Sequence, residues 1–407
     1  MKASPGPELR KRGTMRTTKY LIAGGGMTAD AACKGIRDHD PDGAITVVAD
    51  EPHAPYARPP LSKGLWQDHE ESSIWRGTAD LGVELRLGRT LVELDVDARR
   101  ATDDRGDEYA FERLLLATGG RPRRLPFGAD EVVYFRTLDD YRRLRALADD
   151  GARFVVIGGG FIGSEIAAAL AANGRSVTMV FPESGIGARI FPAELSAFVT
   201  DYYRARGVEV LAGTSVNAIE RDGDVVRART DDGRTLEADA IVAGLGIEPR
   251  VELAAAAGLP IDDGIVVDDR GRVGGDTRVF AAGDVARFPE AALGGTRRVE
   301  HEDHAKTHGR LVGANMAGAD TPYDHLPFFY SDLFDLGYEA VGELDSRLET
   351  VADWSEPGEE GTVYYLDGAG KPRGVLLWNL FGRVDSAREL IRAGEPVEQE
   401  ALVERVA

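Results

Sequence analysis

Short apolar runs alternate with helix-like stretches along most of the chain. The first apolar run, 20–23, ends at a glycine cluster and is followed by a small-residue, helix-like stretch over 28–37. A β-branched run over 44–49 then ends at Asp50. Strand, helix and strand in this order predict a βαβ unit, which implies a parallel sheet covered by helices.

The same pattern occurs a second time. An apolar run over 153–157 leads into a second glycine cluster, a helix-like stretch over 164–172 and a strand-like run over 176–181. Further along, the segment 114–122 after the first unit is similar to the segment 241–249 after the second. These matches indicate an internal duplication of a dinucleotide-binding unit.

The last part of the chain has a different pattern, in which strands come first and helices follow. Strands are predicted over 328–341, 362–365 and 374–378, and helices over 385–392 and 398–406. We therefore expect a small third domain of the α+β type.

The predicted fold class is α/β, with two Rossmann-like dinucleotide-binding domains and a small α+β C-terminal domain. The expected boundaries are 18–125 and 247–325 for the first dinucleotide domain, 126–246 for the second and 326–407 for the third. Residues 1–17 are expected to be a disordered leader, and they lack the apolar segment of a secretory signal.

The first glycine cluster has the spacing of a phosphate-binding turn. Gly24 suits the tight turn, Gly26 lets the backbone approach a pyrophosphate, and Ala29 takes the third, small position. Asp50 ends the next strand, where a carboxylate can accept hydrogen bonds from ribose hydroxyls. The strand before the motif and the helix after it favour a ligand site over a glycine-rich turn without one.

The second cluster carries the full motif in Gly158, Gly160 and Gly163. No acid ends the strand that follows, and the nearest carboxylate belongs to Glu183. Glu183 favours NADH if it binds the adenosine ribose, whereas Arg189 favours NADPH if it binds a 2′-phosphate. We expect NADH and leave NADPH open.

Composition restricts the function further. The 407 residues include 49 Lys and Arg against 69 Asp and Glu, and this net charge of −20 argues against nucleic acid or an anionic membrane as partner. Cys33 is the single cysteine, which excludes a disulfide framework, a cysteine zinc site and an internal redox dithiol. No apolar run has the length of a membrane span, and the cysteine usage fits a cytoplasmic location.

Several further segments together resemble FAD-dependent ferredoxin reductases and apoptosis-inducing factor. They are the loop 56–63, the segments 279–284 and 298–305, and the aromatic region 330–333 with 337–342. The segments from 298 onward are more similar to apoptosis-inducing factor than to typical ferredoxin reductases. The resemblance implies FAD on the first domain, NAD(P)H on the second and a third domain that covers the flavin.

The expected FAD contacts come partly from the residues and partly from this resemblance. Asp284 follows a glycine turn and can bind the ribityl chain, although a helix N-cap explains the same motif. Arg58 and Lys63 lie on a proline-stiffened loop and can face the pyrophosphate and the flavin. The further FAD residues that we expect are Thr118, Gly119, Glu300, His301 and Tyr330. For Tyr330 the alternative is an aromatic side chain packed in the hydrophobic core.

The resemblance also pairs Lys63 with Glu165 beside the flavin. We therefore expect a buried ion pair that orients the ring and tunes its electrophilicity. The NAD(P)H contacts implied by the resemblance are Gly246 and Glu339, and Phe161 is expected between the two ligands.

Three histidines, His301, His304 and His308, fall on one face of a predicted helix. They lack an established metal-binding spacing and have no cysteine to support them, so no metal site is expected. Instead, we expect the helix N-terminus to point at the pyrimidine edge of the flavin, where negative charge develops on reduction.

The predicted function is an oxidoreductase in which NAD(P)H gives hydride to N5 of FAD. Without a dithiol, the electrons must pass from the flavin to a ferredoxin, a quinone, a dye or oxygen. Ferredoxins are usually acidic, and outside the leader the clearest basic run for docking one is 121–124. The alternative is a redox-sensing protein like apoptosis-inducing factor, which is reduced slowly, retains NAD+ and forms a homodimer on reduction. A fold without bound FAD is the third hypothesis.

Overall fold

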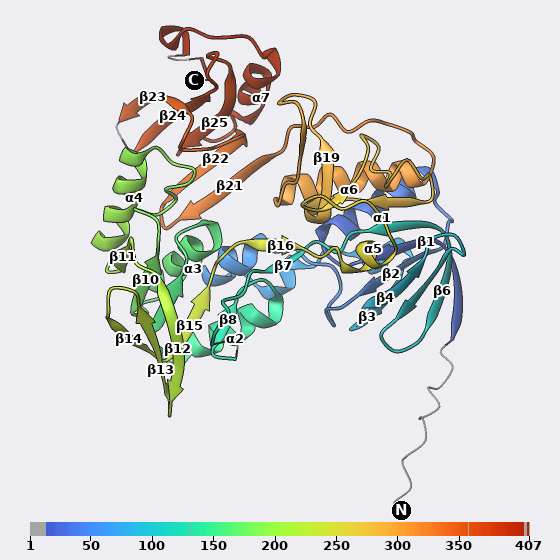
Figure 1. Ribbon diagram of the computed structural model, residues 1–407, viewed down its shortest axis with the longest axis horizontal. Helices are drawn as coiled ribbons and strands as arrows, with labels where there is room; N and C mark the ends of the chain where they lie inside the picture. Colours follow the sequence, from blue (N-terminus) through green and yellow to red (C-terminus); the bar gives the residue numbers. More distant parts are fainter. Residues whose placement is uncertain (1–13, 129, 357, 403–404, 407) are drawn as a thin grey trace, which may run out of the picture.

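The computed structural model describes residues 14–128, 130–356, 358–402 and 405–406. Figure 1 shows three parts: a large sheet that carries α1 and α6, a second sheet covered by helices, and a C-terminal sheet above the second. No helix among these residues is long and apolar enough to cross a membrane.

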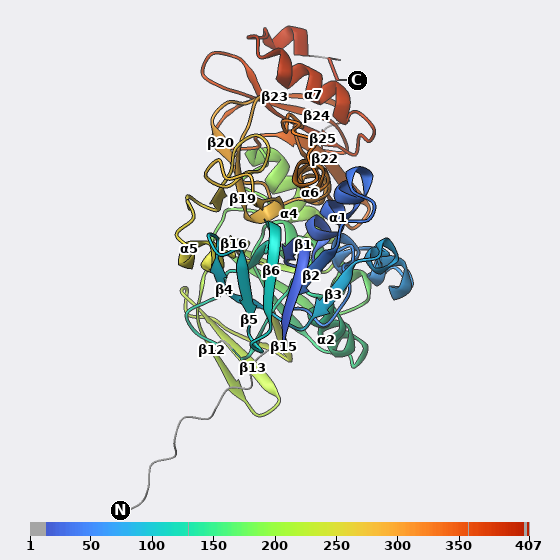
Figure 2. The ribbon, with the colours of Figure 1, turned by 90° about the vertical axis from the view of Figure 1, so that its right-hand side faces the viewer.

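The first sheet has seven strands in the order β3-β2-β1-β6-β5-β4, and β18 pairs with the carboxyl half of β6. Strands β1, β2, β3, β6 and β18 run parallel, as the apolar runs predict, and Figure 2 shows the sheet as a row of neighbouring strands. The bounds are β1 (Met15–Ala23), β2 (Ile45–Ala49), β3 (Glu84–Leu87), β4 (Leu91–Asp95), β5 (Arg100–Asp103), β6 (Glu108–Leu116) and β18 (Val279–Ala281).

Two helices, α1 (Met27–His39) and α6 (Glu302–Met316), pack tightly against each other over this sheet. Glycines permit the close approach, because a Cβ on Gly313 would lie 2.2 Å from the Ala32 carbonyl oxygen. The contact fixes the N-termini of both helices near the carboxyl ends of the parallel strands, which is where α/β proteins bind ligands.

The second sheet is fully parallel, with the order β11-β10-β9-β15-β8. Its strands are β8 (Val132–Tyr134), β9 (Phe154–Ile157), β10 (Val177–Phe181), β11 (Glu209–Ala212) and β15 (Ala240–Ala243). Its helices are α2 (Leu138–Asp149), α3 (Phe161–Ala172) and α4 (Ala193–Ala205). An antiparallel sheet of β12 (Val216–Asp222), β13 (Val225–Thr230) and β14 (Thr235–Ala238) follows.

The chain passes between these two parts twice, and the two passages pair with each other. Strand β7 (Gly120–Pro122) runs antiparallel to β16 (Ile247–Pro249). The remaining elements of the first part are α5 (Glu252–Ala256), β17 (Ile265–Val266), β19 (Ala286–Pro289), β20 (Thr296–Arg297) and the 3-10 helices Pro59–Ser62, Gly64–Trp66, Glu71–Ile74, Thr78–Leu81 and Gly283–Val285.

The third part is an antiparallel sheet of order β21-β22-β25-β24-β23 with helix α7 (Val384–Ala393) packed on it. Its strands are β21 (Phe328–Leu333), β22 (Leu336–Gly342), β23 (Glu349–Glu356), β24 (Glu360–Leu366) and β25 (Pro372–Trp378). One hydrophobic cluster joins residues of the first part's loop, the second sheet and this third sheet, so the three parts form one packed body.

Two expectations at the ends of the chain are corrected. Strand β1 already begins at Met15, which pairs with Glu108, so 15–17 do not belong to a disordered leader, and 1–13 lie outside the described residues. The helix expected over 398–406 is reduced to the 3-10 helix Gln399–Leu402, with 403–404 not described. Such a short segment forms too few i→i+4 hydrogen bonds to offset the cost of ordering an α-helix.

Candidate functional site

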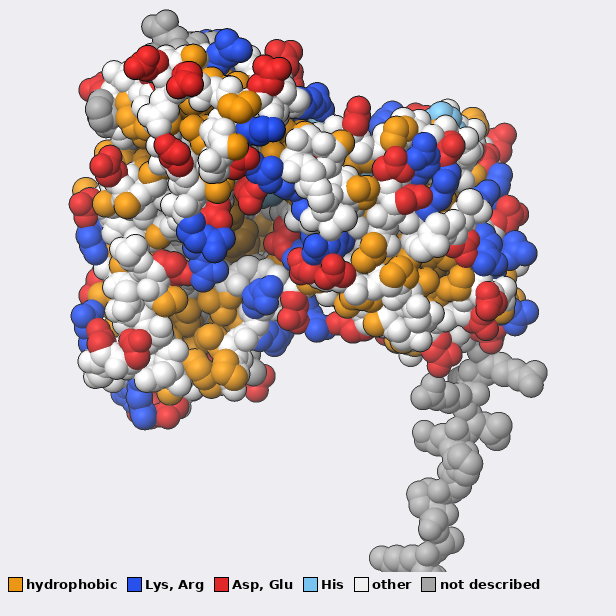
Figure 3. Space-filling view, turned by 45° about the horizontal axis from the view of Figure 1, so that its top comes forward, with side chains coloured by type: hydrophobic (Ala, Val, Ile, Leu, Met, Phe, Trp, Pro, Cys, Tyr) orange, Lys and Arg blue, Asp and Glu red, His pale blue; other side chains and the backbone are white. Residues whose placement is uncertain are grey.

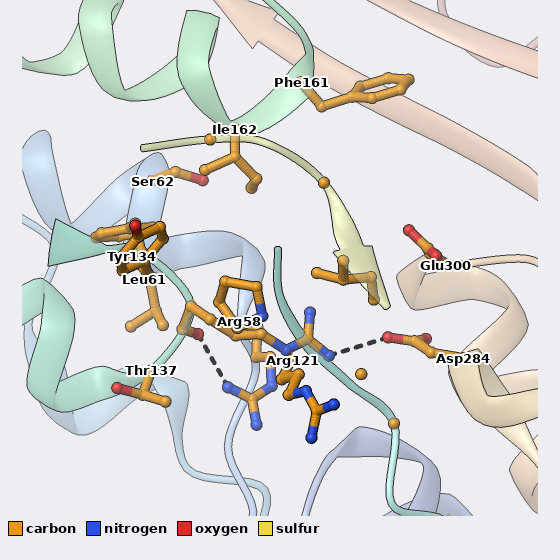
Figure 4. Close-up of a pocket in the computed structure, with 18 of the residues that line it drawn as sticks. Arg58, Leu61, Ser62, Arg121, Tyr134, Thr137, Phe161, Ile162, Asp284 and Glu300 are labelled. Atoms are coloured by element: carbon orange, nitrogen blue, oxygen red, sulfur yellow. Dashed lines mark hydrogen bonds and ion pairs between the residues drawn. The ribbon is translucent and has the colours of Figure 1, made fainter. Parts of the chain in front are cut away.

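A single cavity of about 1180 Å³ runs between the three parts and collects most of the expected site residues. Figure 3 shows the hollow on the surface and Figure 4 shows its lining. Both glycine turns open into it, together with the loop 58–63, the end of β10 and the start of α6.

The first glycine turn has the shape that a bound pyrophosphate requires. Gly24 has a φ of 114°, and a Cβ there would lie 2.2 Å from the Ala117 carbonyl oxygen. Gly26 is the N-cap of α1, no described side chain caps it, and no described atom lies within 4 Å of its Cβ position. The first amide groups of α1 therefore face open space that suits an anion. Ala29 is buried under the sheet and lies outside the cavity.

The second glycine turn repeats this geometry. Gly158 has a φ of 117° and a Cβ position 2.4 Å from the Gly244 carbonyl oxygen, whereas Gly160, the N-cap of α3, is open. A Cβ on Gly163 would meet the Gly158 carbonyl oxygen at 2.0 Å, so this packing position admits only glycine. Both turns fit a dinucleotide pyrophosphate, and neither Ala29 nor Gly163 lines the cavity.

Two consecutive acids, Asp50 and Glu51, follow β2, and the sequence pattern pointed only to Asp50. Burial acts to raise the pKa of Asp50, but the ion pair with Arg250 and hydrogen bonds from backbone amides together hold the pKa below the ordinary value. Glu51 binds Arg58 at 2.6 Å and accepts a hydrogen bond from the Tyr56 hydroxyl at 2.5 Å. Both acids line the cavity beside the first turn.

An arginine that the sequence analysis missed connects Arg58 to Asp284. Arg136 forms an ion pair of 3.1 Å with Asp284, and its carbonyl oxygen accepts a hydrogen bond of 2.9 Å from Arg58. Burial, followed by the neighbouring Arg58 charge, lowers the pKa of Arg136. Two arginines here are suited to the charge of a pyrophosphate, and the Asp284 carboxylate lies where it can accept hydroxyl hydrogen bonds.

At the second turn, Glu183 and Arg189 form an ion pair of 2.5 Å. The sequence had suggested them as separate, competing contacts for NADH and for NADPH. Both line the cavity just after β10. The Arg189 side chain is 83% exposed and that of Glu183 is 24% exposed. The carboxylate is therefore the more buried partner, and the guanidinium extends into solvent.

Lys63 and Glu165 form the expected ion pair, with 2.6 Å between Nζ and Oε1. Their side chains are 13% and 6% exposed. Lys63 also lies 3.3 Å from Asp332 and 5.4 Å from the centre of the Tyr330 ring. Both side chains line the cavity into which the two glycine turns open, and Glu165 belongs to the helix that starts at the second turn.

Aromatic side chains form the wall of the cavity next to the third part. The ring of His301 stacks on Phe329 at 4.5 Å, and Phe161 contacts both rings edge-on. Burial lowers the pKa of His301 to about 4, so the ring is neutral at neutral pH. Burial raises the pKa of Glu300, which forms an ion pair with Arg298.

The remaining predicted residues divide into two groups. Thr118, Gly119, Gly246 and Tyr330 line the cavity, and the Tyr330 hydroxyl donates to Glu302 at 2.9 Å. Glu339 does not line it, because its Oε2 accepts from the Gly382 amide at 3.0 Å on another side of β22. Its role as a nucleotide contact stays a prediction.

The two histidines that follow His301 on α6 are buried and form an aromatic cluster with Phe288 and Tyr323. His304 Nδ1 lies 3.0 Å from the Tyr323 hydroxyl, and His308 Nδ1 accepts from the Gly283 amide at 3.3 Å. No group of three or more His, Cys, Asp or Glu in the described chain is arranged to hold a metal ion. Cys33 is buried, and burial raises its pKa to about 12, so the thiol is not a nucleophile.

Two dinucleotide turns that share one cavity with a Lys–Glu ion pair define a two-nucleotide redox protein. The family model for pyridine nucleotide-disulphide oxidoreductases matches residues 18–309, and the model for the C-terminal part of mitochondrion-associated apoptosis-inducing factor matches 312–363. The chain belongs to the pyridine nucleotide-disulphide oxidoreductase family. It is an oxidoreductase, and family membership implies FAD and NAD(P)H as its cofactors.

Several relatives resemble almost the whole chain. Apoptosis-inducing factor 1, mitochondrial, of Dictyostelium discoideum is 34% identical over 423 residues, which cover 93% of this chain and 79% of that protein. The ferredoxin–NAD(+) reductase component of the anthranilate 1,2-dioxygenase system of Burkholderia cepacia is 34% identical over 399 residues, or 96% and 98% of the two chains. Monodehydroascorbate reductase 3 of Arabidopsis thaliana is 35% identical over 398 residues, or 89% of each chain.

Solved structures agree with these relatives. The ferredoxin reductase for the CYP199A2 system from Rhodopseudomonas palustris has a TM-score of 0.87 and 32% identity, covering 94% of this chain and 96% of that one. The reductase in the covalent putidaredoxin reductase–putidaredoxin complex has a TM-score of 0.88 and 31% identity, covering 95% of both chains.

Proposed function

We propose that this protein is an NADH-dependent FAD oxidoreductase of the ferredoxin-reductase type, which passes electrons to a ferredoxin or a comparable external acceptor. The observation that carries the proposal is the Lys63–Glu165 ion pair, largely shielded from solvent, on the lining of the one cavity that both glycine turns share. When bound, FAD accepts hydride from the nicotinamide at N5 and passes the electrons onward.

The residues of the cavity supply orientation and electrostatics. Gly26 and the amides of α1 hold the FAD pyrophosphate with help from Arg58 and Arg136. Gly160 and the amides of α3 hold the pyrophosphate of the nucleotide. Lys63 presents a positive charge beside the reacting rings, and Glu165 keeps that charge in place.

NADH is the proposed nucleotide because Glu183 is the carboxylate after β10. Its oxygens suit the two hydroxyls of an adenosine ribose, and their charge opposes a 2′-phosphate. Arg189 is already paired with Glu183, so it is not free to neutralise that phosphate.

The external acceptor follows from the cysteine count. The chain holds one cysteine, which is buried, so no dithiol can take electrons from the flavin. Similarity to reductases of ferredoxin-dependent systems supports a ferredoxin as acceptor. Steady-state oxidation of NADH in the presence of a [2Fe–2S] ferredoxin, a soluble quinone or oxygen alone tests this choice. Turnover that is fast with the ferredoxin supports it, and equal slow turnover with all three acceptors refutes it.

The second candidate function is redox sensing, and the match of 312–363 to the apoptosis-inducing-factor C-terminal model favours it. Such a protein would be reduced slowly by NADH, would keep NAD+ on the reduced flavin and would dimerise. A long-lived charge-transfer band together with dimerisation on addition of NADH would support this function over rapid turnover.

A further inference from the structure

The carboxylate of Glu165 receives three short contacts from three side chains. Oε1 accepts from Lys63 Nζ and from the Ser331 hydroxyl, each at 2.6 Å, and Oε2 accepts from the Ser62 hydroxyl at 2.6 Å. Distances this short are typical of hydrogen bonds to an ionised carboxylate. Glu165 is 6% exposed, Ser62 is 6% exposed and Ser331 is 1% exposed, so water does not replace either hydroxyl.

The donors come from different parts of the fold. Ser62 ends the 3-10 helix next to Lys63, and Glu165 lies in the first turns of α3 in the second part. Ser331 lies on β21, a strand of the third part that also carries Tyr330 and Asp332. The third part therefore contributes a direct hydrogen bond to the charged pair in the cavity.

Lys63 has a second carboxylate within reach. Asp332 lies 3.3 Å from Nζ and its side chain is 48% exposed, whereas Glu165 is buried. A lysine side chain is a mobile point charge on a flexible stem, so its position depends on how firmly its partner is held. Because hydrogen bonds hold Glu165 at both oxygens, the Lys63 ammonium stays paired with the buried Glu165 and does not move to the more exposed Asp332.

We propose that Ser62 and Ser331 are positioning residues for hydride transfer, which act through Glu165 by fixing where the Lys63 charge lies. This inference rests on the proposed function. Docking of β21 completes the reactive site, so the C-terminal part takes a direct role in the chemistry in addition to covering the cavity.

The kinetic test measures the rate constant of flavin reduction at saturating NADH in Ser331→Ala, Ser62→Ala and the double variant. Loss of one hydrogen bond to a buried charge is expected to slow reduction about tenfold, with the double variant slower still. The Kd for NADH should change little, because both hydroxyls bond to the Glu165 carboxylate and not to a backbone amide of a glycine turn. Ser346→Ala is the matched control: its hydroxyl also joins the third part to the second, donating to the Ala188 carbonyl oxygen at 2.8 Å, but it does not contact Glu165.

A double-mutant cycle separates positioning from general packing. In a Glu165→Ala background, which removes the oxygen that accepts from Ser331, the Ser331→Ala change is expected to have less than a twofold effect. An equal loss of rate in both backgrounds would overturn the proposal, as would native rates in both serine variants. Conservative Ser331→Thr and Ser62→Thr variants, which keep the hydroxyl, are expected to recover most of the rate.

Crystal structures of the FAD-bound variants supply a readout independent of turnover. In Ser331→Ala we expect the Lys63 ammonium to have moved from Glu165 toward Asp332. Unchanged positions of Lys63 and Glu165 in the double variant would refute the positioning role. If the native protein is not reduced by NADH at all, the proposed function fails, and these structures still decide whether the serines position the pair.

Discussion

The ammonium of Lys63 lies 2.6 Å from the carboxylate of Glu165, although 102 positions separate the two residues in the chain. The contact joins the loop after the first βαβ unit to the first helix of the second dinucleotide unit. A buried pair of this kind stabilises the fold only weakly, because the gain barely exceeds the cost of desolvating both charges. Its position in the shared cavity argues instead for a role in catalysis.

Removal of Lys63 is therefore expected to affect both rate and stability. Lys63→Ala leaves a buried carboxylate with two hydroxyl donors and no cation, and we expect flavin reduction by NADH to slow by about a hundredfold. The melting temperature should fall, whereas Lys19→Ala, which removes a partly exposed pair with Asp40, should change neither quantity much. Rapid-mixing kinetics and thermal denaturation measure the two effects, and a native reduction rate in Lys63→Ala would contradict the assigned role.

Gly26 and Gly160, whose Cβ positions face open space, should tolerate an added methyl group better than Gly24 and Gly158, whose Cβ positions lie against a carbonyl oxygen. Gly26→Ala and Gly160→Ala meet no described protein atom, so both variants should fold, but the added methyl occupies the expected phosphate positions. We expect weaker FAD binding in the first and a higher Kd for NADH in the second, each by about tenfold or more.

Gly24→Ala is the contrasting variant, because its Cβ would collide with the Ala117 carbonyl oxygen at a φ of 114°. It should be unstable even before cofactor is added. Titrations of apoprotein with FAD and of holoprotein with NADH measure the affinities. Native affinities in the Gly26 and Gly160 variants would show that the pyrophosphates lie elsewhere.

Glu183 should set the preference for NADH. Glu183→Ala removes the ribose acceptor and releases Arg189 from its ion pair, so the Kd for NADH should rise about tenfold while NADPH binds better than before. Glu194→Ala, an exposed acid at the start of α4, is the matched control. An unchanged ratio of kcat/KM values for the two nucleotides would refute this role.

Acid should destabilise the folded protein through its buried histidines. Burial lowers the pKa of His304 to about 3, against an ordinary value of 6.5, so between these values the unfolded chain binds a proton that the folded chain does not. The free energy of unfolding then falls as pH decreases, by about 1.4 kcal/mol per pH unit for this residue. Denaturant titrations from pH 8 to about pH 4.5 should therefore give a shallower pH dependence for His304→Gln, and an unchanged slope would contradict this reasoning.

Much of the fold could be predicted because its signals are local. An apolar run, a glycine cluster and a helix-like stretch occupy consecutive residues, and both units have the parallel pairing that this order implies. The beginning of β1 was missed because Arg16 and Thr17 are polar residues on an extended part of the strand. A pattern based on apolar residues does not detect such an extension.

The site was predictable only where a motif or a family resemblance identified the residue. Glu51, Arg136 and Ser331 contribute through contacts that only the tertiary fold creates. Glu51 and the Arg136 carbonyl oxygen each bind Arg58, and Ser331 binds Glu165. No local sequence pattern encodes these contacts. Glu183 and Arg189 were treated as competing signals, whereas in the fold they neutralise each other. Glu339 fits the family motif, yet its carboxylate is directed to a backbone amide outside the cavity.

The most direct test of the central claim is a rapid-mixing experiment in which the FAD-loaded protein meets NADH or NADPH without oxygen, followed by the absorbance of the flavin. We expect rapid bleaching with NADH, slower bleaching with NADPH and a strong loss of rate in Lys63→Ala. A protein that fails to bind FAD, or whose bound flavin stays oxidised in excess NADH, would contradict it.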